Sequence, residues 1–345
     1  MPHVLVTGGA GFFGGILKRH LLRHRWHVSS IDRVADANWH PHLTKIKGDV
    51  RDPWLLNSVF RRTRYDAVFH CAAVVPRGKT DEGDLWTSNV DASRKLAKSC
   101  REAGVPKFVF ISTSCLWGGA AGHAVREGDA PAPVDLYGES KLAAEDALSG
   151  FFGAMELVIL RSSLIVDSTP QGLLAILFDF IHDGKTVWVI GEGGNRYQLT
   201  CAEDLLRACM TALHPGVKGV FHIGNPGVKP VRELWQAVIE AAGTASTIRS
   251  LPEKATRTAL RLAGGMGLLS LGPYESRMIS DDFFFDTAKA RERLGWRPSL
   301  SGEQLLVQAY RSYTSRREDS RQPGIAAAWS RRAPLGVLRL LKWVS

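Results

Sequence analysis

The 345-residue sequence lacks the features that mark several other classes of protein. Its five cysteines form no C-x-x-C pair and no pairing with histidine at the spacing of zinc ligands, so we expect reduced thiols and no metal site. No run approaches the roughly 18 apolar residues that a membrane-spanning helix needs. The first residues enter a strand pattern directly, without the features of a leader peptide. We therefore expect a soluble, cytoplasmic protein.

Acidic residues are fewer than basic ones, and the formal net charge is +10. Much of the excess lies between Lys18 and His27 and in the tail after Arg311, and we interpret both as solvated surfaces. RNA-recognition signatures and zinc-finger spacings are missing, so no nucleic-acid partner is expected. The apolar and basic run 334–344 could contact a membrane surface, although docking of this tail on protein is the favoured interpretation.

Short β-rich runs alternate with longer amphipathic stretches over the first 160 residues, as in βαβ units. This order predicts an α/β fold with a Rossmann-type doubly wound parallel sheet and helices on both faces. The predicted strands are His3–Thr7, His27–Asp32, Thr44–Lys47, Ala67–His70, Lys107–Thr113 and Glu156–Arg161, and the predicted helices are Phe12–Arg25, Pro53–Arg62, Leu85–Ala103 and Tyr137–Ser149.

After Arg161 the pattern loosens, and we expect a smaller, interleaved C-terminal substrate lobe. The predicted dinucleotide-binding domain spans residues 1–168, and 200–225 return to it. The substrate lobe is expected to comprise 169–199 and 226–322. Residues 323–345 would form a basic and apolar tail.

A glycine-rich turn follows the first predicted strand and opens the first helix. Gly8, Gly11 and Gly14 fall three residues apart, which permits a tight turn, a close approach of backbone to pyrophosphate and close packing of helix on sheet. The start of the helix, at Phe12 and Phe13, offers unpaired N–H groups to the phosphates. This pattern predicts a dinucleotide site.

Asp32 ends the next strand, where a carboxylate accepts hydrogen bonds from the adenosine ribose hydroxyls. A carboxylate there would repel a 2′-phosphate, so we expect NAD. Arg33 beside it could instead receive that phosphate, which leaves NADP as the alternative.

Tyr137 and Lys141 stand four residues apart at the start of a predicted helix, so their side chains share one face. A nearby ammonium group stabilises a phenolate and would lower the pKa of Tyr137 from about 10. The pair is therefore a candidate general acid and base for interconverting a carbinol and a carbonyl.

Taken in order, these motifs resemble those of extended short-chain dehydrogenases/reductases, and more narrowly the NAD-dependent epimerase/dehydratase family of sugar-nucleotide enzymes. The resemblance runs over roughly residues 3 to 315 and is looser toward the C-terminus. Its motifs are the glycine-rich turn, Gly48–Asp52, His70–Ala73, Asn89, Ile111–Ser114, Tyr137-x-x-x-Lys141, Tyr197–Leu205, Phe221–Gly224, Phe285–Ala290 and Leu294–Pro298.

The resemblance implies roles for five further residues around the cofactor. Asp49 and Val50 would lie against the adenine. Ala72 and Ala73 would line the channel of the nicotinamide ribose, and Asn89 would support a neighbouring loop. It also implies that Lys141 holds that ribose and that the protein is a homodimer.

The resemblance places Thr113 where the family has the Ser or Thr that hydrogen-bonds the substrate hydroxyl. Ser114 and Cys115 occupy the positions of the Asp-Glu pair of sugar-nucleotide 4,6-dehydratases, so dehydration is not expected. We take Ser114 as a substrate contact.

Two substrate classes stay open. The first is a nucleotide-diphosphate sugar, the substrate of an epimerase or 4-keto reductase, with Arg196, Arg232 and Arg277 as candidates to hold its pyrophosphate. The second is a hydrophobic alcohol, as in 3β-hydroxysteroid dehydrogenases, which would use apolar runs such as 259–271. A non-catalytic dinucleotide sensor is disfavoured because Thr113, Tyr137 and Lys141 are all present.

Overall fold

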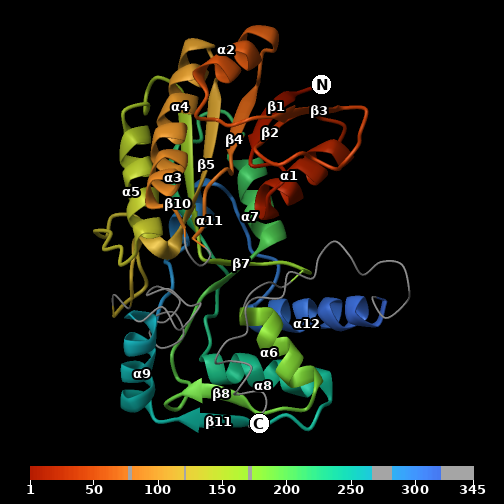
Figure 1. Ribbon diagram of the computed structural model, residues 1–345, viewed down its shortest axis with the longest axis vertical. Coiled ribbons are helices and arrows are strands. Elements are labelled where there is room, and N and C mark those ends of the chain that lie inside the picture. The colour runs from red at the N-terminus through yellow and green to blue at the C-terminus, as the bar shows by residue number, and fades with distance from the viewer. Residues whose placement is uncertain (77–79, 120–121, 170–172, 266–281, 320–345) are drawn as a thin grey trace.

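The computed structural model describes residues 1–76, 80–119, 122–169, 173–265 and 282–319. One large sheet forms the N-terminal part, and a smaller lobe lies below it in Figure 1. The sheet has seven parallel strands in the order β10-β6-β5-β4-β1-β2-β3, which confirms the predicted doubly wound α/β fold. The strands are β1 (His3–Thr7), β2 (His27–Asp32), β3 (Leu43–Lys47), β4 (Ala67–His70), β5 (Lys107–Thr113), β6 (Glu156–Ser162) and β10 (Gly219–Ile223).

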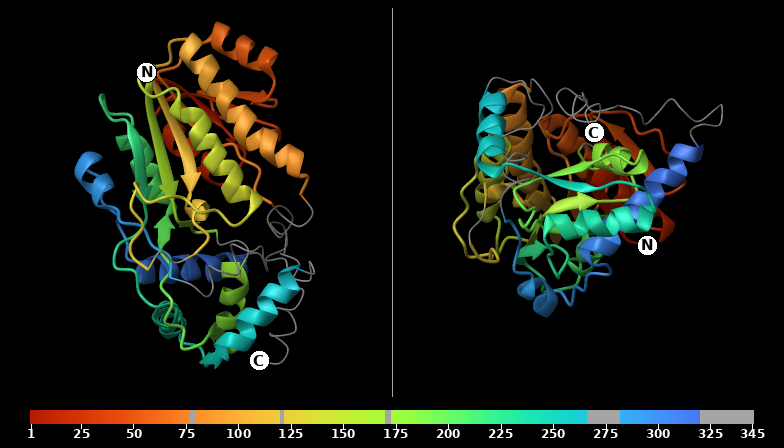
Figure 2. Two further views of the ribbon diagram at one scale, coloured as in Figure 1. Left: turned by 90° about the vertical axis from the view of Figure 1, so that its left-hand side faces the viewer. Right: turned by 90° about the horizontal axis from the view of Figure 1, so that it is seen from below.

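Helices cover both faces of this sheet (Figure 2). Their apolar sides form two separate cores, because strand side chains alternate between faces. In β1, for example, Val4 and Val6 join one core and Leu5 joins the other. One face carries α2 (Pro53–Arg62), α4 (Ala92–Glu102) and α5 (Leu136–Ser149), and the other carries α1 (Phe12–Arg23), α7 (Ala202–Thr211) and α11 (Ala288–Arg293).

The helix predicted over Leu85–Ala103 is present, but its turns are not uniform. The chain forms α3 (Glu82–Trp86), then a π-helical segment η1 (Thr87–Asp91), and only then α4. Within η1, Asn89 is buried, and its amide is committed to hydrogen bonds outside the helix. Such wide turns are frequent at functional sites, and helical periodicity does not reveal them.

The smaller lobe is built on the parallel pair β8 (Val187–Ile190) and β11 (Ile248–Leu251). Phe178, Trp235 and Tyr310 pack edge-to-face in its core, one from each of three helices. Those helices are α6 (Leu173–His182), α8 (Val231–Ala242) and α12 (Gly302–Asp319); α9 (Glu253–Gly265) lies beside them in Figure 1, and the short strands β7 (Leu164–Val166) and β9 (Leu199–Cys201) pair between lobe and sheet.

β10 returns from the lobe to the sheet by pairing with β6. The exact bounds proposed for the two lobes stay a prediction. The tail 323–345 lies outside the described residues.

Lys18 departs from the expected solvated surface. Its side chain is fully buried and forms an ion pair with Asp36, which lies in the loop between β2 and β3. The other basic side chains between Lys18 and His27 are exposed or partly exposed, as expected of a solvated surface.

None of the helices in the described part of the chain has both the length and the apolar character needed to cross a membrane. Within the same residues, no three or more His, Cys, Asp or Glu side chains gather as metal ligands would.

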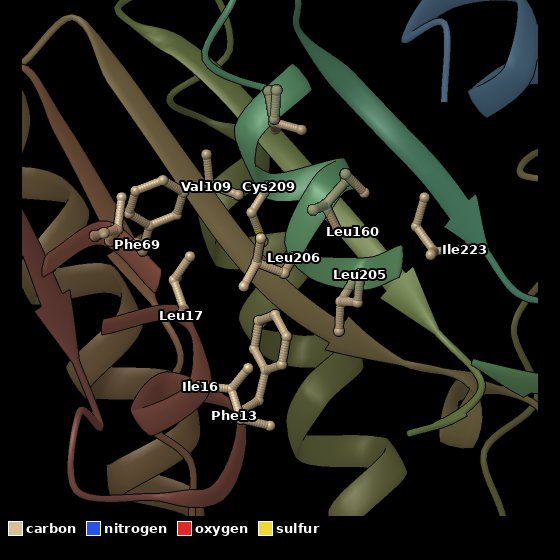
Figure 3. Packing of buried hydrophobic residues seen from close by; sticks show 14 of the residues in the cluster. Phe13, Ile16, Leu17, Phe69, Val109, Leu160, Leu205, Leu206, Cys209 and Ile223 are labelled. Atoms are coloured by element: carbon tan, nitrogen blue, oxygen red, sulfur yellow. The ribbon is translucent and has the colours of Figure 1, made fainter. Parts of the chain in front are cut away.

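Phe69 tests the core between the sheet and α1 and α7, shown in Figure 3. Its side chain is 0% exposed, so we expect Phe69→Ala to lower the free energy of unfolding by about 3–5 kcal/mol through lost burial and a cavity. Phe152→Ala is the matched control, because Phe152 is 40% exposed. Urea unfolding of both variants measures the difference, and equal losses would contradict this account.

Candidate active site

The glycine-rich turn leaves no room for side chains. Gly8 has a φ of +71°, and a Cβ there would lie 2.8 Å from the backbone of Ala72, in the loop after β4. A Cβ on Gly14 would lie 2.3 Å from the carbonyl oxygen of Gly8. Gly11 caps α1 without a side chain, so the first N–H groups of the helix are left to other partners. The turn therefore fits a dinucleotide pyrophosphate.

The two phenylalanines at the start of α1 differ in their surroundings. Phe13 is buried and packs beside Ile16 in the core drawn in Figure 3, whereas Phe12 is partly exposed. Phe13 can therefore offer a phosphate its backbone N–H but not its side chain.

Asp32 lies at the end of β2 and is half-buried. Its carboxylate accepts hydrogen bonds from the N–H groups of Ala10, at 3.0 Å, and Val34, at 2.9 Å. These bonds fix the carboxylate beside the glycine-rich turn.

A row of alternating charges lies at this same end of the site. Asp49 accepts hydrogen bonds from Arg51, and Arg51 also donates to Asp84 of α3 at 2.8 Å. Asp84 accepts a further bond from Arg33. The guanidinium of Arg51 holds the pKa of Asp49 below its usual range. Val50, between two members of the row, is buried against the core.

The loop after β4 is fixed by a buried side chain. Asn89 accepts a hydrogen bond from the N–H of Val74, donates to the carbonyl of Val74, and donates to the hydroxyl of Ser140 on α5. Ala72 and Ala73 precede Val74 in this loop and lie partly or fully exposed. Asn89 thus connects the loop to the helix that carries Tyr137.

Helix α5 begins where Asp135 caps the N–H of Gly138. Gly138 lets the helix approach the β5 end, since a Cβ there would lie 2.3 Å from the carbonyl of Cys115. Lys141, one turn on from Tyr137, is buried, donates to the carbonyl of Ile111 at 2.8 Å, and lies over the Phe110 ring.

The expected lowering of the Tyr137 pKa is wrong for this structure. Burial raises the pKa of the phenol, and Cys115 and Asp135 add to the effect. Burial also lowers the pKa of Lys141, to about 8, against the opposing charge of Glu145. Tyr137 is a protonated phenol at neutral pH and can donate a proton.

Thr113 ends β5 and is half-buried, and its hydroxyl accepts a hydrogen bond from the N–H of Cys115. Ser114 opens the short helical turn η2 (Ser114–Leu116) and is buried. Cys115 interacts electrostatically with both Tyr137 and Lys141. The ends of β5 and α5 therefore converge on one small region.

Sequence reasoning missed Glu145, a buried residue of α5 that lies one turn after Lys141. It accepts hydrogen bonds from Ser112 at 2.5 Å and from Arg161 at 2.6 Å, and all three side chains are buried. Arg161 also lies over the Trp117 ring. The four-residue steps from Tyr137 to Lys141 to Glu145 were the signal that could have found it.

The predicted pyrophosphate arginines are engaged within the protein. Arg196 donates to Asp282 through Nε and Nη2 and stacks over Phe284. Arg232 donates to the carbonyl of Glu192 and to Ser250. Both lie around one turn of the smaller lobe, because Val231 donates to the carbonyl of Asn195. Arg277 lies outside the described residues.

Comparisons with known proteins agree with this geometry. The model of the NAD dependent epimerase/dehydratase family matches residues 4–224. The chain is 34% identical to the protein y4nG of Sinorhizobium fredii, over 91% of this chain and 79% of that one. It is 28% identical to the 3 beta-hydroxysteroid dehydrogenase/Delta 5-->4-isomerase of Mycobacterium tuberculosis, over 91% of each.

A solved structure has the same fold. It is the UDP-glucuronic acid 4-epimerase of Bacillus cereus in complex with UDP-glucuronic acid and NAD. The TM-score is 0.72 at 22% identity, over 91% of this chain and 99% of the epimerase.

Gly14→Ala tests the turn. Because the added Cβ would meet backbone, we expect binding of NAD to weaken by about tenfold or more. Gly15→Ala is the matched control, since its Cβ would lie 3.4 Å from the flexible end of Arg19. Calorimetric titration with NAD and circular dichroism measure binding and folding. Equal affinities in two folded variants would contradict the argument.

Glu145→Gln tests the support beneath Lys141. Removing the negative charge that raises the pKa of Lys141 should bring that pKa below about 8, so the alkaline limb of kcat/KM moves to lower pH. Unfolding should become easier by about 3 kcal/mol, because the charge of Arg161 loses its buried partner. Glu139→Gln, on the exposed side of the same helix, is the control. An unshifted limb in the Glu145 variant would contradict the role.

Proposed function

Because the chain belongs to the NAD-dependent epimerase/dehydratase family, we propose that it acts on a carbinol of a nucleotide-diphosphate sugar, as an epimerase or oxidoreductase. It is an enzyme of the extended short-chain dehydrogenase/reductase type, and its cofactor is NAD. The observation that carries the proposal is the convergence of Thr113, Tyr137 and Lys141 at the ends of β5 and α5. The shared fold with an epimerase solved with a UDP-sugar and NAD supports the substrate class.

Each of the three side chains has a distinct part in the proposed reaction. Thr113 hydrogen-bonds the sugar hydroxyl and orients it. Tyr137 exchanges a proton with that oxygen as general acid or base. Lys141 adds a positive charge from within a buried setting, where charge acts strongly. NAD, when bound, supplies the hydride acceptor and a positive charge that favours the phenolate.

The residues around the cofactor divide by the part of it they would hold. We propose that Gly8, Gly11 and Gly14, with the N–H groups of Phe12 and Phe13, hold the pyrophosphate. Asp32 and Arg33 would lie at the adenosine ribose, Asp49 and Val50 at the adenine, and Ala72 and Ala73 at the nicotinamide ribose, with Asn89 as their support.

Substrate contacts are proposed at Ser114, Arg196 and Arg232. Asp282 accepts hydrogen bonds from Nε and Nη2 of Arg196. Among the residues that the structure describes, Nη1 of Arg196 has no hydrogen-bond partner, which leaves a donor for a phosphate oxygen. Arg232 lies beside it around the same turn. A guanidinium pair at one turn suits the two phosphates of a nucleotide sugar.

A second candidate is the oxidation of a 3β-hydroxysteroid. The similarity to a mycobacterial enzyme of that name over 91% of the chain favours it. The apolar runs that would receive a steroid fall largely on residues 266–271 and 334–344, outside the described part of the chain.

We further propose that the protein is a cytoplasmic homodimer that pairs through α4 and α5. These helices lie side by side on one face of the sheet (Figure 2), and their outer sides are exposed.

Tyr137→Phe tests the proposed chemistry. The purified chain is given NAD with UDP-, GDP- and dTDP-sugars, and isomer formation is followed by NMR. Loss of the phenolic proton should lower kcat by about 10²–10⁴-fold and leave NAD affinity within about twofold. Tyr65→Phe, a buried tyrosine away from the site, is the control.

The outcomes separate the candidates. Isomer formation without a net change in NADH absorbance indicates an epimerase, and net NADH formation with a 3β-hydroxysteroid indicates the second candidate. Undiminished turnover by Tyr137→Phe would overturn both.

A further inference from the structure

Arg33 is the residue that left the choice between NAD and NADP open, and the structure shows where it points. Its Nη1 lies 3.2 Å and 3.3 Å from the two carboxylate oxygens of Asp84. Asp84 belongs to α3, 51 positions further along the chain, so the contact draws the guanidinium from the end of β2 toward that helix. Asp32 keeps its own bonds to backbone N–H groups and does not bind Arg33.

Asp84 is itself held in place. Its N–H donates to the carboxylate of Asp81 at 2.7 Å, which caps α3. Its carboxylate also accepts a bond from Arg51, which is bound to Asp49 and to the hydroxyl of Thr87. The acceptor that holds Arg33 is therefore part of a fixed network rather than a freely moving surface group.

This matters for cofactor choice. NADP differs from NAD by a phosphate on the adenosine ribose, and a guanidinium is the group best suited to bind it. Asp32 stands where it would repel that phosphate, so a neighbouring free arginine would be the main feature in favour of NADP. Asp84 binds only Nη1 of Arg33, so the guanidinium keeps other donors, but the contact holds it toward α3 and the carboxylate offsets its positive charge. A phosphate on the adenosine ribose would therefore gain less from Arg33 than from an unpaired arginine.

We propose that Asp84 is a specificity-determining residue that keeps Arg33 from a 2′-phosphate and so enforces the preference for NAD. The proposal rests on the proposed function, since it assumes that the site of β2 and the glycine-rich turn binds a dinucleotide. It assigns the preference to two residues: Asp32 by repulsion and Asp84 by withholding Arg33.

The test measures binding rather than turnover. Affinities of the full chain for NAD and for NADP are determined by calorimetric titration, and their ratio is compared among variants. Asp84→Asn should raise the affinity for NADP relative to NAD by about fivefold, the upper end for a half-exposed ion pair in a network. Arg51 stays bound to Asp49 and Thr87, so the remaining network is preserved.

Two variants separate the withheld arginine from a general effect of charge. Glu82→Gln removes one negative charge from the exposed side of the same helix and should leave the ratio within about twofold. In the double variant Arg33→Ala/Asp84→Asn the gain should disappear, because the released guanidinium is no longer there. A gain of equal size in the double variant would overturn the proposal.

Arg33→Ala in the otherwise unchanged chain gives an independent reading. If Arg33 is withheld, its removal should change the affinity for NADP by less than about twofold. A much larger loss would show that Arg33 already binds the phosphate and would overturn the proposal. If the unchanged chain binds neither dinucleotide, the proposed function fails as well; if it binds NAD and Asp84→Asn leaves the ratio unchanged, only the role of Asp84 fails.

Discussion

The buried ion pair between Glu145 and Arg161 is the constraint on which the geometry of the chemical centre depends. A carboxylate and a guanidinium removed from water are tolerated only when each is fully paired, and here Glu145 also accepts from Ser112. Ser112 and Arg161 lie opposite each other in the parallel register of β5 and β6. These contacts hold the helix that carries Glu145 against β5 and β6, and so position Tyr137 and Lys141, which lie two turns and one turn before Glu145.

The same pair connects the large sheet to the smaller lobe. Arg161 lies 3.4 Å from His222 of β10, whose ring bonds to the carbonyl of Val125 and stacks near Phe285. Burial and the charge of Arg161 lower the pKa of His222 to about 3, so it stays neutral and adds no second charge beneath the site. Glu145, Arg161 and His222 thus form one continuous buried network that extends from α5, beneath Tyr137 and Lys141, toward the smaller lobe.

Sequence reasoning was most reliable where a local pattern decides the structure. The first six strands of the large sheet follow from short apolar runs, and the glycine-rich turn follows from positions that exclude a Cβ; these were predicted. The short strands β7, β9 and β11 were not. Sequence reasoning failed where distant partners decide. Lys18 is buried because Asp36 meets it, Arg196 is engaged by Asp282 from 86 positions away, and the phenol of Tyr137 takes its pKa from burial. Neither these partners nor the burial of Tyr137 can be identified from the spacing of residues along the sequence.

The two ends of the proposed cofactor site differ in how easily their charges can be rearranged. At the adenosine end, Arg33 and Asp84 are 49% and 38% exposed, and ion pairs in such surroundings contribute little to stability. At the chemical end, Glu145 and Arg161 are 4% and 8% exposed, and losing one partner leaves a buried charge. Substitutions that change the choice of dinucleotide are therefore compatible with folding, whereas substitutions beneath Tyr137 threaten the fold and the chemistry together. The proposed preference for NAD therefore depends on charges that are separate from those that hold Tyr137 and Lys141.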